Sequence, residues 1–122
     1  MKKFQPSGRS TITVRIFHRD VEGLIAFLND VFEAEGEYQV GRPSELRIGD
    51  SIVMISDGGG VRPVFPACLY VYVPDVDATF AKAVARGVRV IDPPAATPWG
   101  DRRATVEDRW GNLWQVATQL AV

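Results

Sequence analysis

One nine-residue pattern occurs twice in the chain, and it sets the expected fold. Residues 17–25 read Phe-His-Arg-Asp-Val-Glu-Gly-Leu-Ile, and residues 72–80 read Tyr-Val-Pro-Asp-Val-Asp-Ala-Thr-Phe. In both, an aromatic residue ends an alternating run, and Asp-Val-acid follows before apolar residues at helical spacing. A second pair of similar tetrads, at residues 47–50 and 109–112, occurs in the same order. Together these two pairs of similar segments predict a duplicated unit of about 60 residues.

Around this stretch, each half is predicted to contain a strand, a helix and then three strands. The helices are expected to follow the N-caps Asp20 and Asp75 and to stop at Gly36 and Gly87. The apolar stripe of the first helix comprises Leu24, Ile25, Leu28, Val31 and Phe32. The predicted strands are residues 11–18, 37–40, 45–48, 51–56, 68–73, 88–91, 103–107 and 113–118.

The segments between these elements set the expected domain organisation. A single domain over residues 1–122 is predicted, made of two repeats at about 11–56 and 67–118. Residues 57–66 are rich in glycine and are predicted to link the repeats. The stretch from Pro93 to Pro98 is predicted to be a second irregular loop.

Composition narrows the classes of function. The chain has 14 Lys and Arg against 15 Asp and Glu, which argues against nucleic acid or an anionic membrane as a partner. One cysteine excludes an intrachain disulfide and a Cys-rich zinc site. No apolar run approaches the roughly 18 residues that span a bilayer. Polar residues follow the basic first four residues, where a signal peptide needs an apolar stretch, so a cytoplasmic protein is expected.

The repeated pattern resembles the vicinal oxygen chelate superfamily, which includes glyoxalase I, extradiol dioxygenases, fosfomycin-modifying enzymes and bleomycin-resistance proteins. Its PhnB-like branch is the most similar. The residues that carry the resemblance are 20–22, 45–51, 70–77, 98–103 and 108–118. The resemblance implies an α+β fold in which tandem βαβββ modules form a curved mixed sheet, and it implies a homodimer. It is weak for activity because one fold hosts many chemistries.

The resemblance also implies that the concave face of the sheet holds the site and that the helices cover the other face. Strand alternation then separates the two faces. The positions expected to face the cavity are Thr13, Arg15, Phe17, Ser51, Val53, Ile55, Cys68, Tyr70, Tyr72, Leu113, Gln115 and Ala117. The positions expected to face the helices are Val14, Ile16, Leu69, Val71, Val73, Trp114 and Val116.

Metal-dependent members of that superfamily supply four ligands, and the resemblance carries these positions to Thr13, Val53, Cys68 and Gln115. Only Gln115 is of a type expected there, and a divalent cation needs several anionic or imidazole donors. The single histidine, His18, is expected at a strand end near solvent. We therefore predict no catalytic metal and no cofactor.

No catalytic residue is predicted either. Cys68 has no histidine beside it to act as a base, so a small buried thiol is expected. Glu45, Glu107 and Asp101 are expected to be ordinary solvated carboxylates.

What remains is a lining of aromatic and cationic side chains. The predicted ligand-binding residues are Arg15, Phe17, Tyr70, Tyr72, Trp99, Trp110 and Gln115. They predict a metal-free protein that binds a small molecule and sequesters a planar or aromatic compound such as an antibiotic, as bleomycin-resistance relatives do. Two alternatives stay open: a superfamily enzyme (a lyase, isomerase or dioxygenase) with a non-standard metal site, and a dimeric domain whose pocket takes an unknown metabolite or serves assembly.

Overall fold

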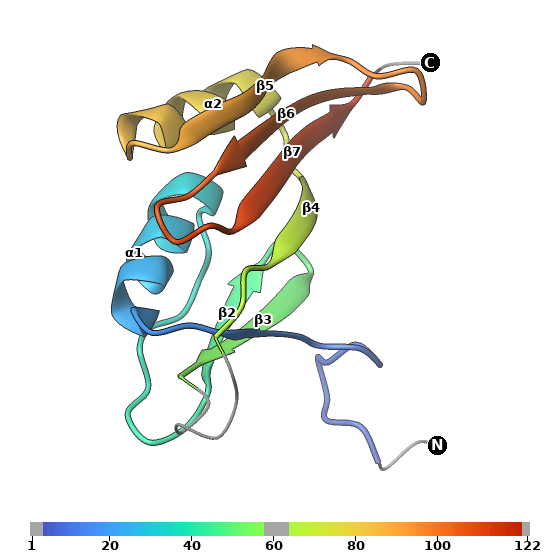
Figure 1. Ribbon diagram of the computed structural model, residues 1–122. Helices are drawn as coiled ribbons and strands as arrows, with labels where there is room; N and C mark the ends of the chain where they lie inside the picture. The colour runs from blue at the N-terminus through green and yellow to red at the C-terminus, as the bar shows by residue number, and fades with distance from the viewer. Residues whose placement is uncertain (1–3, 58–63, 121–122) are drawn as a thin grey trace. The chain divides into compact units, whose positions relative to one another are not determined.

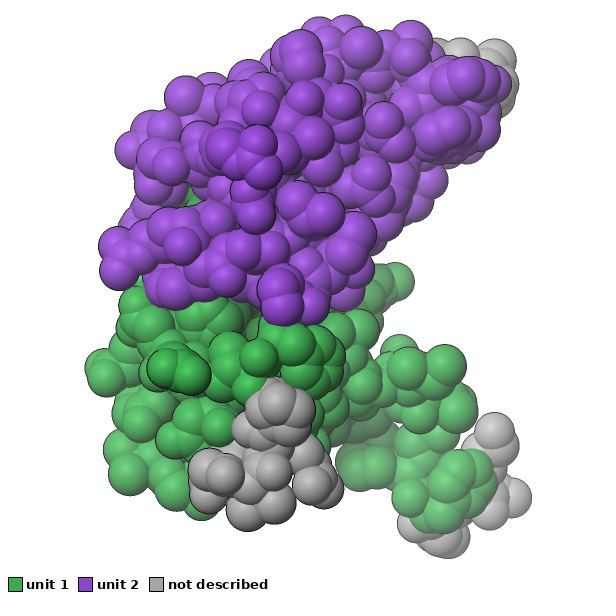
Figure 2. Space-filling model, in the orientation of Figure 1, with its two compact units in different colours: residues 1–65 green, residues 66–122 purple. Residues whose placement is uncertain are grey.

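The computed structural model describes residues 4–57 and 64–120, and it divides into two compact units. Unit 1 comprises residues 1–65 and unit 2 comprises residues 66–122 (Figure 2). In each unit one helix accompanies one mixed sheet (Figure 1). The predicted α+β architecture of two tandem modules is thereby confirmed.

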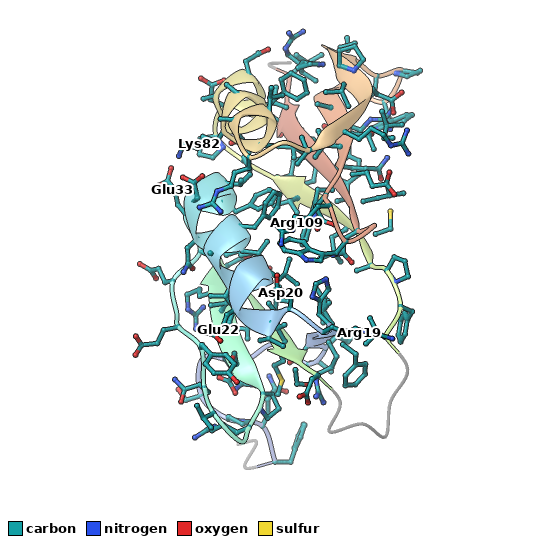
Figure 3. All side chains as sticks on the ribbon, turned by 60° about the vertical axis from the view of Figure 1, so that its left-hand side comes forward. Arg19, Asp20, Glu22, Glu33, Lys82 and Arg109 are labelled. Carbon is teal, nitrogen blue, oxygen red and sulfur yellow. The ribbon has the colours of Figure 1, made fainter. Side chains whose placement is uncertain are left out.

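Unit 1 contains β1 (Val14–Phe17), α1 (Val21–Phe32), β2 (Ser44–Ile48) and β3 (Ser51–Ser56). Its three strands are ordered β1-β3-β2, with β1 parallel and β2 antiparallel to the central β3. The Asp20 carboxylate caps α1 by accepting a hydrogen bond of 3.0 Å from the Gly23 N–H. Figure 3 shows Asp20 at one end of α1 and Glu33 at the other. All five residues of the predicted apolar stripe are buried.

The ends of the helix and the segment after it differ from the prediction. The helix ends at Phe32 because Glu33 adopts a left-handed conformation, with φ of 54°, three residues before Gly36. The predicted strand at residues 37–40 is wrong, since the described chain there forms no ladder and only an isolated bridge joins Glu35 to Arg47. Its backbone instead turns, and the Gln39 N–H donates to the Ser44 hydroxyl at 2.8 Å.

The alternation predicted for β3 is also wrong. Val53 and Ile55 pair with Val14 and Ile16 of β1, so they lie on the same face as the buried Ile16. Only 4% of Val53 and none of Ile55 is exposed. Burial of large aliphatic side chains is the main stabilising contribution to such a small core, and it sets which face of β3 turns inward.

Unit 2 contains β4 (Cys68–Tyr72), α2 (Val76–Ala85), β5 (Arg89–Ala96), β6 (Asp101–Glu107) and β7 (Leu113–Gln119). Its four strands are ordered β4-β7-β6-β5; β4 is parallel to β7, and the other pairs are antiparallel. The Asp75 carboxylate caps α2 by accepting from the N–H groups of Asp77 and Ala78, at 3.1 and 3.2 Å. β4 pairs with residues 113–117 of β7, so Cys68 lies opposite Leu113 and Tyr72 lies opposite Ala117.

β5 extends through part of the predicted loop, because it includes Pro93 and Pro94. It is an edge strand, where a missing N–H does not break a ladder on both sides. The pairing with β6 is irregular around these prolines, with register shifts after Val90 and after Asp92. Among the described residues, no helix is long and apolar enough to cross a membrane.

Candidate functional site

Two tyrosines of β4 meet a carboxylate from the start of β6. The Tyr70 and Tyr72 hydroxyls both donate to Oδ2 of Asp101, at 2.7 and 2.9 Å. Their ring centroids lie 5.5 Å apart with planes tilted by 59°. We call Tyr70, Tyr72, Trp99, Asp101 and Arg103 the Asp101 cluster.

The strand register brings these residues to one face of the sheet. Across β7, Tyr70 pairs with Gln115 and Tyr72 pairs with Ala117. Gln115 and Ala117 pair in turn with Thr105 and Arg103 of β6. Paired residues point to the same side of a sheet, so these side chains share the face opposite Trp114 and Val116, which are buried. The alternation predicted for β4 and β7 agrees with this register.

The turn before β6 fixes Asp101 and presents Trp99. The Thr97 hydroxyl accepts from the Asp101 N–H at 3.0 Å, and the Thr97 N–H donates to the Asp101 carbonyl at 2.7 Å. At the tip of this turn, the Trp99 indole N–H donates to the Tyr70 hydroxyl at 3.3 Å. The Arg103 guanidinium lies 5.3 Å from the centroid of the Trp99 ring.

The hydrogen bonds define the charge state of the cluster. Asp101 is only 3% exposed, so the expectation of a solvated carboxylate is wrong. The hydrogen bond from Tyr70, reinforced by that from Tyr72, lowers the pKa of Asp101, while desolvation opposes this. Burial and the bond to Asp101 raise the pKa of Tyr70, and the bond to Asp101 is the main cause that raises the pKa of Tyr72. At neutral pH the carboxylate is therefore ionised and both phenols keep their protons.

Two polar atoms of β6 on this face lack a hydrogen-bond partner within the described residues: Nε of Arg103 and Oγ1 of Thr105. Both atoms are buried, and Thr105 as a whole is 4% exposed. Arg103 also has a long ionic contact of 3.9 Å with Asp92. The sequence analysis set Asp101 aside as a solvated carboxylate and did not consider Arg103 or Thr105 as site residues, because the register that pairs Thr105 with Gln115 is not visible in the sequence.

A hollow adjoins the cluster at Tyr72. It is shallow, has a volume of about 560 Å³, and is lined by Tyr72, Val73, Pro74 and Gln119. Because Asp101 pairs with Gln119, the hollow lies at the same end of the sheet as the carboxylate. Of the three aromatic residues, Tyr72 lines this hollow, and all three are partly exposed: 38% of Tyr70, 63% of Tyr72 and 61% of Trp99.

The other predicted ligand-binding residues are not brought into this cluster by unit 2. Arg15 and Phe17 belong to unit 1, where the Arg15 guanidinium lies 5.1 Å from the Phe17 ring and donates to the Ser56 hydroxyl at 3.2 Å. Phe17 also meets Phe65 of the same unit, with ring centroids 6.4 Å apart. Trp110 lies in the turn between β6 and β7, at the end of these strands away from Asp101.

The four positions that the resemblance marks as metal-ligand positions do not fit a metal ion. Val53 offers carbon only and lies on the buried face of β3. Met54 is the residue of β3 that pairs with Arg15, on the opposite face. Thr13 precedes β1, and Cys68 is exposed at the start of β4, contrary to the expected buried thiol. Gln115 lies beside Tyr70. In the part of the chain that the structure describes, no group of three His, Cys, Asp or Glu side chains could hold a metal.

His18 is buried, not near solvent, with 4% exposed. Its imidazole Nδ1 accepts from the Asp20 N–H at 3.1 Å, and the backbone N–H of His18 donates to the Ser56 carbonyl at 2.9 Å. The bend between β1 and α1 thus draws the imidazole inward, where it supports the start of the helix.

The Asp-x-x-Gly-Asn-x-Trp motif at residues 108–114 has a structural role. Oδ1 of Asp108 accepts from the N–H groups of Trp110 and Asn112, at 3.0 and 2.9 Å. Its Oδ2 accepts from the Asn112 amide and the Trp114 indole, both at 2.9 Å. The side-chain Oδ1 of Asn112 then accepts from the Ala67 N–H at 2.8 Å, which ties the turn to the start of β4.

Comparisons with known proteins agree with this architecture. The family model described as Glyoxalase/Bleomycin resistance protein/Dioxygenase superfamily matches residues 11–116. Uncharacterized proteins of Mycobacterium bovis and Mycobacterium tuberculosis are 32% identical over 82 residues, in matches that cover 58% of this chain and 54% and 48% of theirs. The matched region therefore spans about half the length of these relatives.

Solved structures are similar over most of their length. TioX from Micromonospora sp. ML1 is 26% identical with a TM-score of 0.76, covering 91% of this chain and 99% of that one. A glyoxalase/bleomycin resistance protein/dioxygenase family enzyme from Burkholderia phytofirmans PsJN is 21% identical with a TM-score of 0.73, covering 88% and 97%. A lactoylglutathione lyase from Agrobacterium tumefaciens is 19% identical with a TM-score of 0.68, covering 93% and 95%. The last two similarities concern the fold alone.

Proposed function

Because the chain belongs to the Glyoxalase/Bleomycin resistance protein/Dioxygenase superfamily, we propose that it binds a planar aromatic small molecule, such as an aromatic antibiotic, without a metal ion. The binding surface is the face of unit 2 that carries the Asp101 cluster. The function is sequestration, so no step of chemistry is assigned to any residue.

The observation that carries this proposal is the exposure of fixed aromatic rings on one face. Tyr70 and Tyr72 are held by hydrogen bonds to a single carboxylate, yet 38% and 63% of these residues stay exposed. Trp99 stands beside them with 61% exposed. Rings that are already ordered lose little entropy when a flat ligand packs on them, and offset stacking adds roughly 0.5–1.5 kcal/mol per ring pair.

The donor set favours binding without a metal. Of the four positions inherited from metal-dependent relatives, Thr13 and Val53 supply no anionic or imidazole group, and Cys68 and Gln115 supply one thiol and one amide. A bound divalent cation requires more anionic or imidazole donors than these. On the same face the carboxylate of Asp101 is already bonded to the two tyrosine hydroxyls.

Titration of the intact protein with a panel of planar aromatic antibiotics tests the proposal, with tryptophan fluorescence as the readout. Saturable quenching is expected, because Trp99 lies beside the ring pair and reports on contact with a flat ligand. The Tyr72→Ala variant keeps this reporter and is expected to bind about tenfold more weakly, since it removes the more exposed ring.

The matched control is Tyr38→Ala, which removes an exposed tyrosine of unit 1 that is 43% exposed. Its affinity should equal that of the wild type, and treatment with a chelator should change neither protein. Absence of saturable quenching by every compound, or equal weakening in both variants, would contradict the proposal.

A further inference from the structure

We propose that Arg103 and Thr105 form an acceptor-binding subsite beside the tyrosines, and that the aromatic ligand carries a carboxylate or carbonyl oxygen that they bind. The inference rests on the proposed function and specifies the class of ligand. The subsite uses side chains to which the fold gives no other complete set of partners.

Two buried polar atoms of β6 are the first evidence for the subsite. Within the described residues, Nε of Arg103 and Oγ1 of Thr105 are buried and make no hydrogen bond. Buried donors are paired in the great majority of native structures, because each unpaired one loses its hydration without compensation. Two such groups on one strand are therefore expected to serve a partner from outside the chain.

Arg103 and Thr105 lie on the same face of the sheet as the two tyrosines. Arg103 and Thr105 are alternate residues of β6, so their Cα atoms are about 6.8 Å apart and both side chains leave the same face. Thr105 is in register with Gln115 and, beyond it, Tyr70. Arg103 is in register with Ala117, whose small side chain separates it from Tyr72. A ring on the tyrosines would thus bring a substituent over β6.

The positive charge of Arg103 favours an anionic group on the ligand. The guanidinium of Arg103 has a carboxylate neighbour, Asp92, only at 3.9 Å, and the side chain of Asp92 is 52% exposed. An exposed pair at that distance is weak, so Arg103 keeps most of its attraction for an anion. The Asp101 carboxylate on the same face accepts hydrogen bonds from the two tyrosine hydroxyls. Among the described residues, the Arg103 guanidinium has no short hydrogen bond to a carboxylate. A carboxylate is therefore expected to bind better than a neutral carbonyl.

The test compares three ligands that share one ring system: 2-naphthoate, 2-naphthamide and 2-(aminomethyl)naphthalene. Protein-observed ¹H–¹⁵N NMR titration of the intact chain follows the Trp99 indole N–H and the Arg103 Nε–H. Binding should decrease in that order, with about tenfold between the carboxylate and the amine. The Arg103 Nε–H signal should shift with the first two ligands and not with the amine.

Thr105→Val is the decisive variant, because it removes the hydroxyl and keeps the shape of the side chain. We expect it to weaken 2-naphthoate binding several-fold, to leave the amine unaffected and to keep or raise the melting temperature, since the lost hydroxyl has no described partner. Arg103→Gln should weaken 2-naphthoate about tenfold or more. The control is Arg102→Gln, which removes the same charge from the opposite face of β6, where Arg102 pairs with Asp77.

The outcomes separate the two proposals. Equal affinity for the three ligands, with Thr105→Val indistinguishable from wild type, would overturn the subsite and leave aromatic binding intact. Preference for the carboxylate that is lost equally in Arg102→Gln would also overturn it, since the attraction would then be general. If none of the three binds at millimolar concentration, both proposals fail.

Discussion

At the scale of single residues, Asp101 organises the face that we assign to ligand binding. A carboxylate that is 3% exposed needs strong donors, and two phenols supply them on the same oxygen. The same hydrogen bonds hold the rings of Tyr70 and Tyr72 in fixed positions beside Trp99. One buried acidic residue therefore fixes the positions of three aromatic side chains.

The pKa shifts in this cluster predict how stability depends on pH. The folded pKa of Asp101 is below its ordinary 3.8, so its contribution is complete above that value and is lost as the pH falls through the lowered pKa. The folded pKa values of Tyr70 and Tyr72 are above 10.0, so their contribution is lost as the pH rises through them. We expect a plateau in the unfolding free energy between these limits, measured by urea unfolding from about pH 2 to about pH 11.

The double variant Tyr70→Phe/Tyr72→Phe should be less stable on this plateau, and its stability should fall less steeply in acid, because Asp101 has lost the bonds that lower its pKa. Tyr38→Phe serves as the control and should follow the wild type. An unchanged acid slope in the double variant would show that these hydrogen bonds do not set the titration of Asp101.

At the scale of elements, the close approach of two segments in unit 1 depends on one glycine. Gly36 has φ of 134°, and a Cβ there would lie 2.4 Å from the Glu45 carbonyl oxygen. A side chain at this position would strain the backbone and push β2 away from the segment after α1. The residue expected to end the helix thus serves the packing of a strand instead.

We predict that Gly36→Ala lowers the unfolding free energy by about 3 kcal/mol, through backbone strain and the clash with β2 together. Gly41→Ala is the matched control, because Gly41 also has a positive φ, of 76°, but faces open space. That variant should lose only about 1 kcal/mol. Chemical denaturation of both gives the difference, and equal losses would remove the argument for close approach.

The Asp108 network predicts a second effect at this scale. Asp108→Ala would leave four donors without their acceptor, among them the side chains of Asn112 and Trp114, so we expect a loss of about 3 kcal/mol or more. Asp50→Ala, which removes an exposed carboxylate bonded only to the neighbouring Ser51 among the described contacts, should change stability by less than about 0.5 kcal/mol. Thermal unfolding measures both, and a mild effect at Asp108 would refute the structural role of the motif.

At the scale of the whole molecule, the two units have a similar order of elements but carry different side chains on their sheets. Unit 2 has a four-stranded sheet with a carboxylate, an arginine and three aromatic residues on one face. Unit 1 has a three-stranded sheet, and its Arg15 stacks on Phe17. Both units run from a strand to a helix and then to further strands, while the residues on the faces of their sheets differ.

The inherited metal positions predict the composition of the purified protein. After dialysis against a chelator-free buffer, elemental analysis should find zinc, iron, manganese and nickel far below one ion per chain, because Thr13, Val53, Cys68 and Gln115 do not form a donor set for them. Ligand affinity should be the same before and after addition of these ions. One equivalent of tightly held metal would contradict the prediction.

Both helix caps, the apolar stripe of α1 and the face of β4 that carries Tyr70 and Tyr72 could be predicted from the sequence. These features depend on local periodicity and capping, which the chain displays directly. The inward face of β3, the burial of His18 and the bonds of Asp101 to two tyrosines became visible in the folded chain alone. Such features depend on register between strands distant in sequence, and a shift of one residue exchanges the two faces of a sheet.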